Sequence, residues 1–381
     1  MIRFGAQSCR TRVHGQSASM ASQKVIALDA MGGDHGPEVL VPGAALSLER
    51  QPALNFIFFG QQARVEAVLK AYPKLAARSR IVHTDHVIAM DEKPSQALRR
   101  GKGSSMWLAL DAVKTGEADA AVSAGNTGAL MAIAKLLLRP ITGIERPAIA
   151  ALWPTVKSEC IVLDAGANIG ATAAQLTDYA LMGAAMARAV FHIERPSVGL
   201  LNVGTEEMKG NEDVKAAHAL LKSAESLPLD YKGFVEGDQI GQGAVDVVVV
   251  EGFAGNIALK TAEGTARQIG TYLRAAMTSS LMSKLGALFA QGGFRVLKEK
   301  MDPRRVNGGT FLGLNGIAVK SHGGADAFGF ASAVDLAYEM ADSGLIARLT
   351  ADIDGFHHRL SAAGPGGMPP ERSAGGALGK G

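Results

Sequence analysis

Strand-like and helix-like segments alternate along this chain from about residue 24 to residue 345. The strand-like runs are rich in Val, Ile and Leu and lie at 25–29, 55–59, 81–83, 198–203 and 246–250. Amphipathic segments between them, such as 38–50, 61–71 and 105–115, are typical of helices. Continuous apolar strands are buried on both faces, so helices must cover both sides of the sheet. We expect a three-layer α/β/α fold with a mostly parallel sheet.

Composition supports this class and excludes others. The chain has 381 residues, of which 46 are Gly and 5% are aromatic, which favours close-packed α/β layers with tight turns over a β-sandwich. A formal charge of +3 is too small to indicate a nucleic-acid partner. Only Cys9 and Cys160 are present, so neither a disulfide framework nor a cysteine zinc site is expected, and a cytoplasmic location is favoured.

The chain ends differ from the middle. Residues 1–22 carry Arg3, Arg10 and Arg12 and no acid, which fits a transit peptide or an upstream extension with Met20 as an alternative start. The Gly/Pro-rich tail from about residue 362 is expected to be disordered. We therefore predict an α/β domain over 23–345 with a helical insertion at about 265–302, then a helix end and tail over 346–381.

Two strand-to-helix turns, at 118–128 and 160–168, are rich in small residues and glycine. Such turns expose backbone N–H groups at the positive end of a helix, where a phosphate binds well. Three further strands run into polar loops at 29–37, 204–212 and 251–260. If the sheet is parallel, all five strand ends converge on one edge, where ligands of α/β sheets bind.

Taken singly, each of these features has an ordinary structural explanation. A Gly-Asn pair usually marks a turn, a lone Asp after a strand usually caps a helix, and Lys209 alone would be a solvated lysine. Recurrence at successive strand ends is what favours a site. Dinucleotide, nucleoside-triphosphate and nucleophile-elbow motifs are missing, and no neighbouring His in the sequence marks Ser123 as a nucleophile.

Several short motifs follow one another in order between about residues 24 and 340. They lie at 26–34 with Gly36 and Pro37, 90–94, 123–130, 146–148, 163–168, 199–204, 207–210, 252–256 with Leu259 and Lys260, and 320–323. On these motifs the chain resembles the bacterial phosphate acyltransferases that use acyl carrier protein. Glu251 and Gly324 depart from the residues that are commoner in that family.

The resemblance implies transfer of a long fatty acyl group from acyl carrier protein to inorganic phosphate. The acyl phosphate product would be used by a membrane glycerol-3-phosphate acyltransferase in phospholipid synthesis. It also implies a homodimer, no metal and no other cofactor, and a fold similar to phosphate acetyltransferases and isocitrate-dehydrogenase-like enzymes.

Attack of phosphate on a thioester requires few catalytic groups from the protein. Phosphate is already a nucleophile near neutral pH and a thiol is a good leaving group, so the protein must chiefly hold phosphate and stabilise the developing oxyanion. The expected catalytic residues are Lys209, Asn256, Lys260 and His322. The expected phosphate- or substrate-binding residues are Asp29, Gly32, Gly33, Asp34, Ser123, Gly125, Asn126, Thr127, Asp164 and Asn168. Of these, Asp29 and Asp34 would orient donors, because a carboxylate repels phosphate.

A further stripe bears on partners. Apolar residues recur at helical spacing at Leu273, Met277, Leu281, Leu285 and Leu288. Such a stripe either faces the core or touches a membrane surface, which would place the protein peripherally on the inner face of the cell membrane. The basic residues that follow could dock acidic carrier protein or anionic lipid, or form a solvated face; they are Arg295, Lys298, Lys300, Arg304 and Arg305.

Two other functions stay open at this point. One is a phosphate acetyltransferase-like enzyme that acts on a short acyl-CoA. The other is a protein that binds phosphate or acyl chains without catalysis. Assays with both donors, and a search for acyl phosphate, separate the three.

Overall fold

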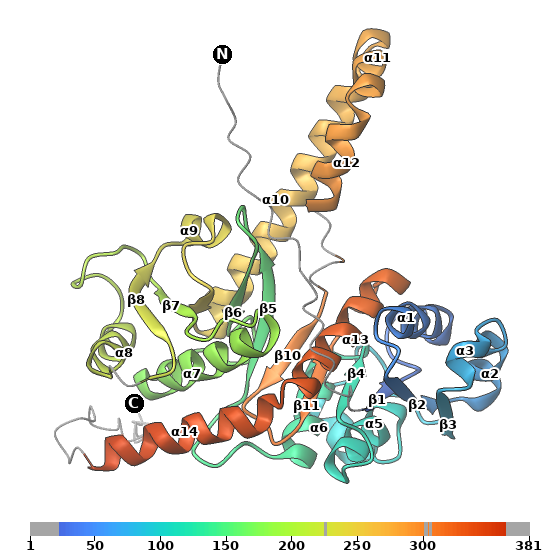
Figure 1. Cartoon of the computed structure of the whole chain (residues 1–381), viewed down its shortest axis with the longest axis horizontal. Helices are drawn as coiled ribbons and strands as arrows, with labels where there is room; N and C mark the ends of the chain where they lie inside the picture. The colour runs from blue at the N-terminus through green and yellow to red at the C-terminus, as the bar shows by residue number, and fades with distance from the viewer. Residues whose placement is uncertain (1–22, 225–226, 301–303, 305–306, 363–381) are drawn as a thin grey trace, which may run out of the picture.

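A computed structural model describes residues 23–224, 227–300, 304 and 307–362. In this part of the chain one sheet of eleven strands has the order β3-β2-β1-β4-β11-β10-β5-β6-β9-β7-β8 (Figure 1). The strands are β1 (Lys24–Asp29), β2 (Leu54–Gly60), β3 (Ser79–His83), β4 (Ala120–Ser123), β5 (Ala148–Pro154), β6 (Glu159–Leu163), β7 (Ser197–Leu201), β8 (Asp230–Val235), β9 (Val247–Val249), β10 (Gly309–Leu312) and β11 (Ile317–Lys320).

Helices cover both faces of the sheet, apart from three that project from it. They are α1 (Pro37–Arg50), α2 (Gln62–Leu69), α3 (Pro73–Ala76), α4 (Pro94–Arg100), α5 (Ser105–Lys114), α6 (Thr127–Leu138), α7 (Ala173–Val190), α8 (Glu212–Ser223), α9 (Gly237–Gln242), α10 (Gly252–Thr278), α11 (Leu281–Phe289), α12 (Gln291–Lys300), α13 (Ala327–Asp342) and α14 (Leu345–Ala362). The expected three-layer α/β/α fold is confirmed.

Alternate residues of each strand serve different cores. In β1, Ile26 and Leu28 join the cluster that includes α1, α7, α13 and α14, whereas Ala27 joins the cluster built with α5 and α6. This burial on both faces explains why the strand is apolar at every position. The second half of the sheet has a smaller cluster on the latter side, where Val162 and Val248 pack with α9 and the start of α10.

The sheet is mostly parallel but not wholly so. The pairs β10–β11, β10–β5 and β5–β6 are antiparallel, and the other seven pairs are parallel. As a result, β6, β9, β7 and β8 run in the opposite direction to β1, β4 and β11. The sequence did not reveal this reversal, because β5 and β10 carry no signal that distinguishes antiparallel from parallel pairing.

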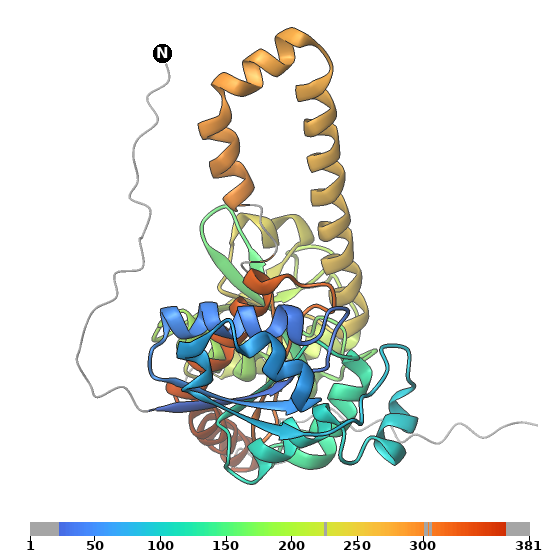
Figure 2. The same ribbon diagram turned by 90° about the vertical axis from the view of Figure 1, so that its right-hand side faces the viewer.

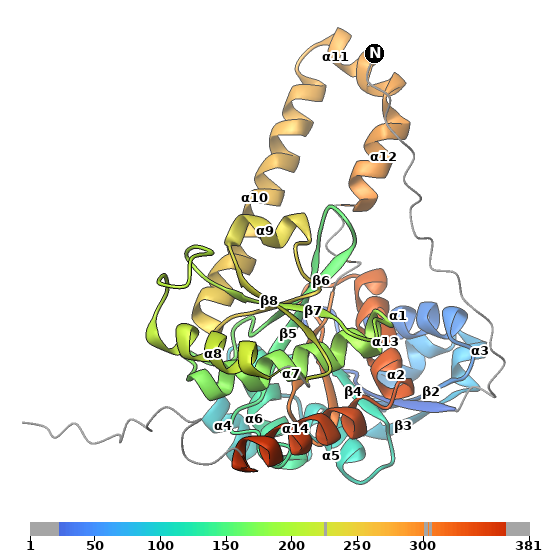
Figure 3. The ribbon, with the colours of Figure 1, turned by 60° about the vertical axis from the view of Figure 1, so that its left-hand side comes forward.

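Three helices project from the sheet layers. Figures 2 and 3 show α10 rising away from the sheet, α11 at the far end and α12 returning. On α11 no residue is buried, and Leu281, Leu285 and Leu288 are 84%, 48% and 56% exposed. The alternative that this stripe faces the core is therefore wrong for these residues. Leu273 and Met277 on α10 are half-buried.

Several expectations fall beyond the described residues. The N-terminal extension and the tail after 362 lie outside them, as do Arg305 and the side chains of Lys298 and Lys300. The domain boundaries stay predictions. The last helix, α14, spans Leu345–Ala362, so it accounts for about half of the segment expected to hold a helix end and tail.

Candidate functional site

The strand ends form two groups, so the expectation that all five meet at one edge is wrong. One group follows β1, β4 and β11, and the other follows β6, β9 and β7, which run the opposite way. Two strands, β10 and β5, separate β11 from β6. Because the strands of the two groups run in opposite directions, their carboxyl ends face opposite edges of the sheet.

In the first group, three strands end in one polar row. The register pairs Asp29 with Ser123 and Ser123 with Lys320. Ser123 Oγ donates to Asp29 Oδ2 at 2.6 Å and accepts from the Gly125 amide at 3.0 Å. Lys320 was not among the expected site residues, because nothing in the sequence showed that β11 lies beside β4.

The row contains a buried carboxyl group, on Asp29, and a half-buried ammonium group, on Lys320. Burial raises the pKa of the Asp29 carboxyl, and hydrogen bonds from Ser105 and Ser123 counter that rise. Burial lowers the pKa of the Lys320 ammonium to about 8, against the attraction of Asp29 and Asp34. Asp29 Oδ1 is buried and has no hydrogen-bond partner among the described residues.

Lys320 keeps donor capacity for a ligand. Its Nζ donates to the Ala124 carbonyl at 3.3 Å and to the Ser321 carbonyl. An ammonium group has three N–H donors. Within the described chain these two carbonyls are its only hydrogen-bond acceptors, so one N–H is left.

Glycines bring backbone close to this row. A Cβ on Gly32 would lie 2.7 Å from Asp29 Oδ2 and from the Gly125 amide nitrogen. Gly33 has φ +83°, and a Cβ there would lie 2.8 Å from the Gly323 carbonyl oxygen and 2.9 Å from the Ala124 Cβ. These loops therefore pack backbone against backbone, which only glycine permits.

The α6 N-terminus adds donors beside Ser123. Asn126 is the N-cap and its Oδ1 accepts from the Ala129 amide at 3.0 Å. The amides of Thr127 and Gly128, which a helix leaves without internal acceptors, have no acceptor in the part of the chain described. Thr127 is exposed, so its hydroxyl is open to solvent.

The Asn126 amide nitrogen is committed to the protein itself. It donates to the carbonyls of Met90 and Glu92, each at 2.8 Å, and to that of Ala89 at 3.4 Å. The side chain thus fixes the 89–92 loop against α6. The contact of Asn126 with phosphate stays a prediction. The observed hydrogen bonds position the 89–92 loop against α6.

His322 and Asp34 complete the first group. The Gly324 amide donates to His322 Nδ1 at 3.1 Å, so in the neutral ring the proton is on Nε2. The Asp34 amide donates to the Gly323 carbonyl at 3.0 Å, which ties the loop after β1 to the turn after β11. Both side chains are exposed.

In the second group, the turn after β6 already holds an anion. Asp164 is buried, and its carboxylate accepts from the amides of Ile149, Gly166, Ala167 and Asn168 at 2.8–3.1 Å. Burial raises the pKa of the Asp164 carboxyl, and these N–H donors oppose the rise. The amides of this turn therefore bind the Asp164 carboxylate of the chain itself, and these N–H groups are not free to bind a ligand.

The other expected residues of this group have different environments. The side-chain amide of Asn168 donates to the Pro147 carbonyl at 2.9 Å and to Tyr179 Oη at 3.1 Å. Asn256, in the first turn of α10, lies against Gly166. Lys209 and Lys260 are about half-exposed and pair with Glu206 and Glu263 at 2.9 Å.

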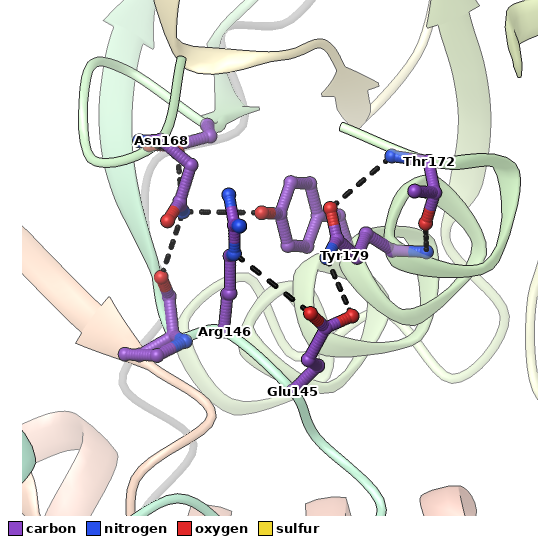
Figure 4. Close-up of polar contacts among 8 residues, drawn as sticks. Glu145, Arg146, Asn168, Thr172 and Tyr179 are labelled. Carbon is purple, nitrogen blue, oxygen red and sulfur yellow. Dashed lines mark hydrogen bonds and ion pairs between the residues drawn. The ribbon is translucent and has the colours of Figure 1, made fainter. Parts of the chain in front are cut away.

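Figure 4 shows a network beside Asn168 whose other members were not among the expected site residues, although Arg146 lies in the 146–148 motif. The Arg146 guanidinium points toward Asn168 and Tyr179, and its Nε lies 3.9 Å from a Glu145 carboxylate oxygen. The Gln175 amide donates to the other Glu145 oxygen at 2.6 Å. Burial raises the pKa of the Tyr179 hydroxyl. This places one arginine next to the second group.

Among the described residues, no cluster of three or more His, Cys, Asp or Glu side chains is arranged to hold a metal ion. Within the same residues, no helix is both long enough and apolar enough to span a membrane.

Comparison with known proteins gives a consistent picture. A family model described as "Fatty acid synthesis protein" matches residues 24–348. A phosphate acyltransferase of Sinorhizobium medicae is 62% identical over 333 residues, covering 87% of this chain and 96% of that protein. One from Xanthobacter autotrophicus is 64% identical over 331 residues, covering 87% and 93%.

Solved structures share the fold at low identity. The EutD phosphotransacetylase of Staphylococcus aureus aligns with a TM-score of 0.55 and 17% identity, covering 84% of this chain and 95% of its own. A phosphotransacetylase of Streptococcus pyogenes aligns with a TM-score of 0.56 and 19% identity, covering 84% and 94%. At this identity the likeness concerns the fold alone.

Proposed function

Since the chain belongs to the phosphate acyltransferase family, a family of acyltransferases in fatty acid and phospholipid synthesis, we propose that it transfers a long-chain acyl group from acyl carrier protein to inorganic phosphate. The observation that carries this proposal is the first strand-end group. There a half-buried lysine with a spare N–H, the open amides of α6 and close-packed glycine loops follow adjacent strands.

We place the phosphate at this group. Lys320, the amides of Thr127 and Gly128, and the Thr127 hydroxyl supply donors of the kind that bind a phosphate dianion. Ser123 and Gly125 shape the loop, and Asp29 holds the ammonium near the row. Gly32, Gly33 and Asp34 border the same place.

The proposed reaction needs no covalent enzyme intermediate. A phosphate oxygen attacks the thioester carbon, the new C–O bond forms, and the C–S bond breaks. The sulfur leaves with the electron pair and takes up the proton that the hydrogen phosphate brought, giving acyl phosphate and free carrier thiol. A thiol with a pKa near about 8.5 leaves readily, so positioning and oxyanion stabilisation dominate.

The remaining predicted residues would act on the donor. His322 Nε2 lies on the exposed turn after β11, where it can donate to the thioester oxygen. We propose that Asn256, Lys209 and Lys260 of the second group contact the extended thioester arm or acyl chain, with Asp164 and Asn168 holding their loop.

The projecting helices fit an amphiphilic product. We propose that the exposed side chains of α11, above all Leu281 and Leu285, contact the membrane surface on its inner face. There acyl phosphate would pass to a membrane glycerol-3-phosphate acyltransferase. The exposed apolar face of α10, with Ile269 and Tyr272, supports pairing with a second copy of the chain.

One assay tests the proposal. Purified protein is incubated with phosphate and either palmitoyl-carrier protein or acetyl-CoA, and acyl phosphate is trapped as the hydroxamate. We expect product from the carrier-protein donor. Product from acetyl-CoA alone would favour the acetyltransferase alternative. Phosphate or lipid binding without product from any donor would refute the enzyme reaction.

A further inference from the structure

The segment 84–105 forms a rim beside the first strand-end group. Asn126 holds the carbonyls of residues 89, 90 and 92. Pro94, at the start of α4, packs against Gly128 in the first turn of α6. Figure 3 shows α4 beside α6. The rim is thus attached to the helix whose N-terminus is proposed to hold phosphate.

The rim is fixed at its other end as well. Thr84 Oγ1 donates to the Gly103 carbonyl at 2.7 Å, and the Ser105 amide donates to the His86 carbonyl at 3.1 Å. These bonds close the segment into a loop with α4 between its ends. A surface held in this way loses little conformational entropy when a partner binds.

The rim carries exposed basic and apolar side chains, together with the exposed acids Asp85 and Asp91. Four exposed cations lie within ten residues, at Lys93, Arg99, Arg100 and Lys102. In the described part of the chain none of the four forms an ion pair. Val87 and Met90 are 37% and 46% exposed in the same segment.

This composition fits a protein partner. Unpaired cations around exposed apolar side chains match an acidic protein surface that also presents an apolar contact. A nucleic acid would call for a longer basic track than one short helix supplies. A membrane would call for a continuous apolar face, whereas Ala97 of α4 is turned into the core.

We propose that this rim, defined by Val87, Met90, Lys93, Arg99, Arg100 and Lys102, is the docking surface for the acidic protein part of the acyl donor. The inference rests on the proposed function, because it takes the donor to be acyl carrier protein. Docking here brings the thioester to the turn of Met90, whose methyl group lies against Gly323 beside His322. This surface does not include the basic cluster within residues 295–305.

The test compares two double variants with the same change in net charge. Arg99→Glu with Arg100→Glu alters the rim, and Lys70→Glu with Lys74→Glu alters exposed lysines near α2 and α3. For palmitoyl-carrier protein we expect the rim variant to raise KM about tenfold or more, with kcat changed less than about twofold, because rim charges govern encounter. The control variant keeps the KM of the unaltered protein.

Binding of holo-carrier protein, measured by surface plasmon resonance at several salt concentrations, separates the two proposals. We expect the rim variant to bind weakly and with a shallower salt dependence than the unaltered protein. Equal binding and equal KM for both double variants would overturn the docking surface while the proposed reaction stands. Carrier-protein binding that depends on the rim, without acyl phosphate formation, would instead refute the reaction.

Discussion

Ser123 donates a hydrogen bond of 2.6 Å to Asp29 where β1 and β4 end side by side. Because Lys320 is paired with Ser123 on the other side, the three residues form one row across adjacent strands. The Asp29 carboxylate, which alone would repel phosphate, attracts the Lys320 ammonium group. In the phosphate site that we propose, the row accounts for the presence of a buried acid.

Replacing Lys320 with Met tests this row. Met keeps the volume of the side chain and removes the charge, so we expect kcat/KM for phosphate to fall by about 100-fold or more, the scale of a lost charge-stabilising donor. The pKa of about 8 adds a pH test, since the ammonium form is lost as pH rises through that value. Activity of the unaltered protein should therefore decline above about pH 8.

The control for Lys320 is Lys70→Met on the exposed end of α2, which should leave kcat/KM and its pH profile unchanged. Full activity of Lys320→Met, or a profile that stays flat through pH 8 and 9, would contradict the role given to the ammonium group. Thermal unfolding of both variants distinguishes loss of function from loss of fold.

Gly33 and Gly103 form a matched pair. Their φ values are +83° and +82°, but a Cβ on Gly103 meets nothing within 4 Å, whereas one on Gly33 would lie 2.8 Å from the Gly323 oxygen. Ala at either position incurs the backbone cost of about 1 kcal/mol. Only Gly33→Ala should also separate the loops and raise KM for phosphate, measured by steady-state kinetics. Equal KM values for the two variants would argue against close loop packing as the basis of the site.

Asn126 is tested by two variants that divide its roles. Asn126→Asp keeps an oxygen to cap α6 but loses the donor to the 89–92 carbonyls, and Asn126→Ala loses both. We expect Ala to lower the free energy of unfolding by about 1–2 kcal/mol through the cap, and Asp by less than Ala. Both should open the 84–93 segment to limited proteolysis. Protection equal to that of the unaltered protein would show that Asn126 does not hold the loop.

The sequence predicted the layers, the mostly parallel character of the sheet and the polar strand ends because these depend on local patterns. Val247 to Val249 reads as a buried strand wherever it lies, whereas the role of Asn126 as the cap of α6 came from the structure. What it did not predict is the order of strands. Two antiparallel insertions, β10 and β5, divide the expected single site into two groups.

The same limit explains the residues that were missed. Lys320 becomes a site residue only because β11 lies beside β4, which is a contact across almost 200 positions of sequence. The sequence indicated that the turn at Asp164 was a site for a bound anion. In the structure the Asp164 carboxylate itself accepts the hydrogen bonds from the backbone amides of that turn. Which N–H groups stay free depends on side-chain directions that a one-dimensional pattern does not contain.

The contact between α14 and α7 should depend on pH. His357 Nε2 lies 3.1 Å from Asp178 Oδ1, and this hydrogen bond raises the pKa of His357, while burial raises the pKa of Asp178. A raised His pKa adds stability that is present below about pH 6.5 and lost as pH rises through the folded-state value. Because His357 is partly exposed, we expect only about 0.5–1 kcal/mol.

The variant His357→Gln should remove that pH dependence, and His358→Gln, at an exposed position next to it, should keep it. The measurement is urea unfolding between pH 5.5 and 8, chosen as roughly one unit or more on each side of the ordinary His pKa. A pH dependence that survives in His357→Gln would assign it to another group.

The exposed end of the projecting helices gives the last prediction. Leu281 on α11 and Val156 between β5 and β6 are 84% and 75% exposed, so Glu at either position should leave the fold intact. Burying a leucine in a membrane surface contributes about 1.5–3 kcal/mol, so Leu281→Glu should weaken binding to anionic phospholipid vesicles by roughly tenfold or more. Co-sedimentation with vesicles measures this, and Val156→Glu should bind like the unaltered protein. Equal binding of both variants would place the membrane contact elsewhere. If neither the variants nor the unaltered protein bind vesicles, the proposed membrane contact is refuted.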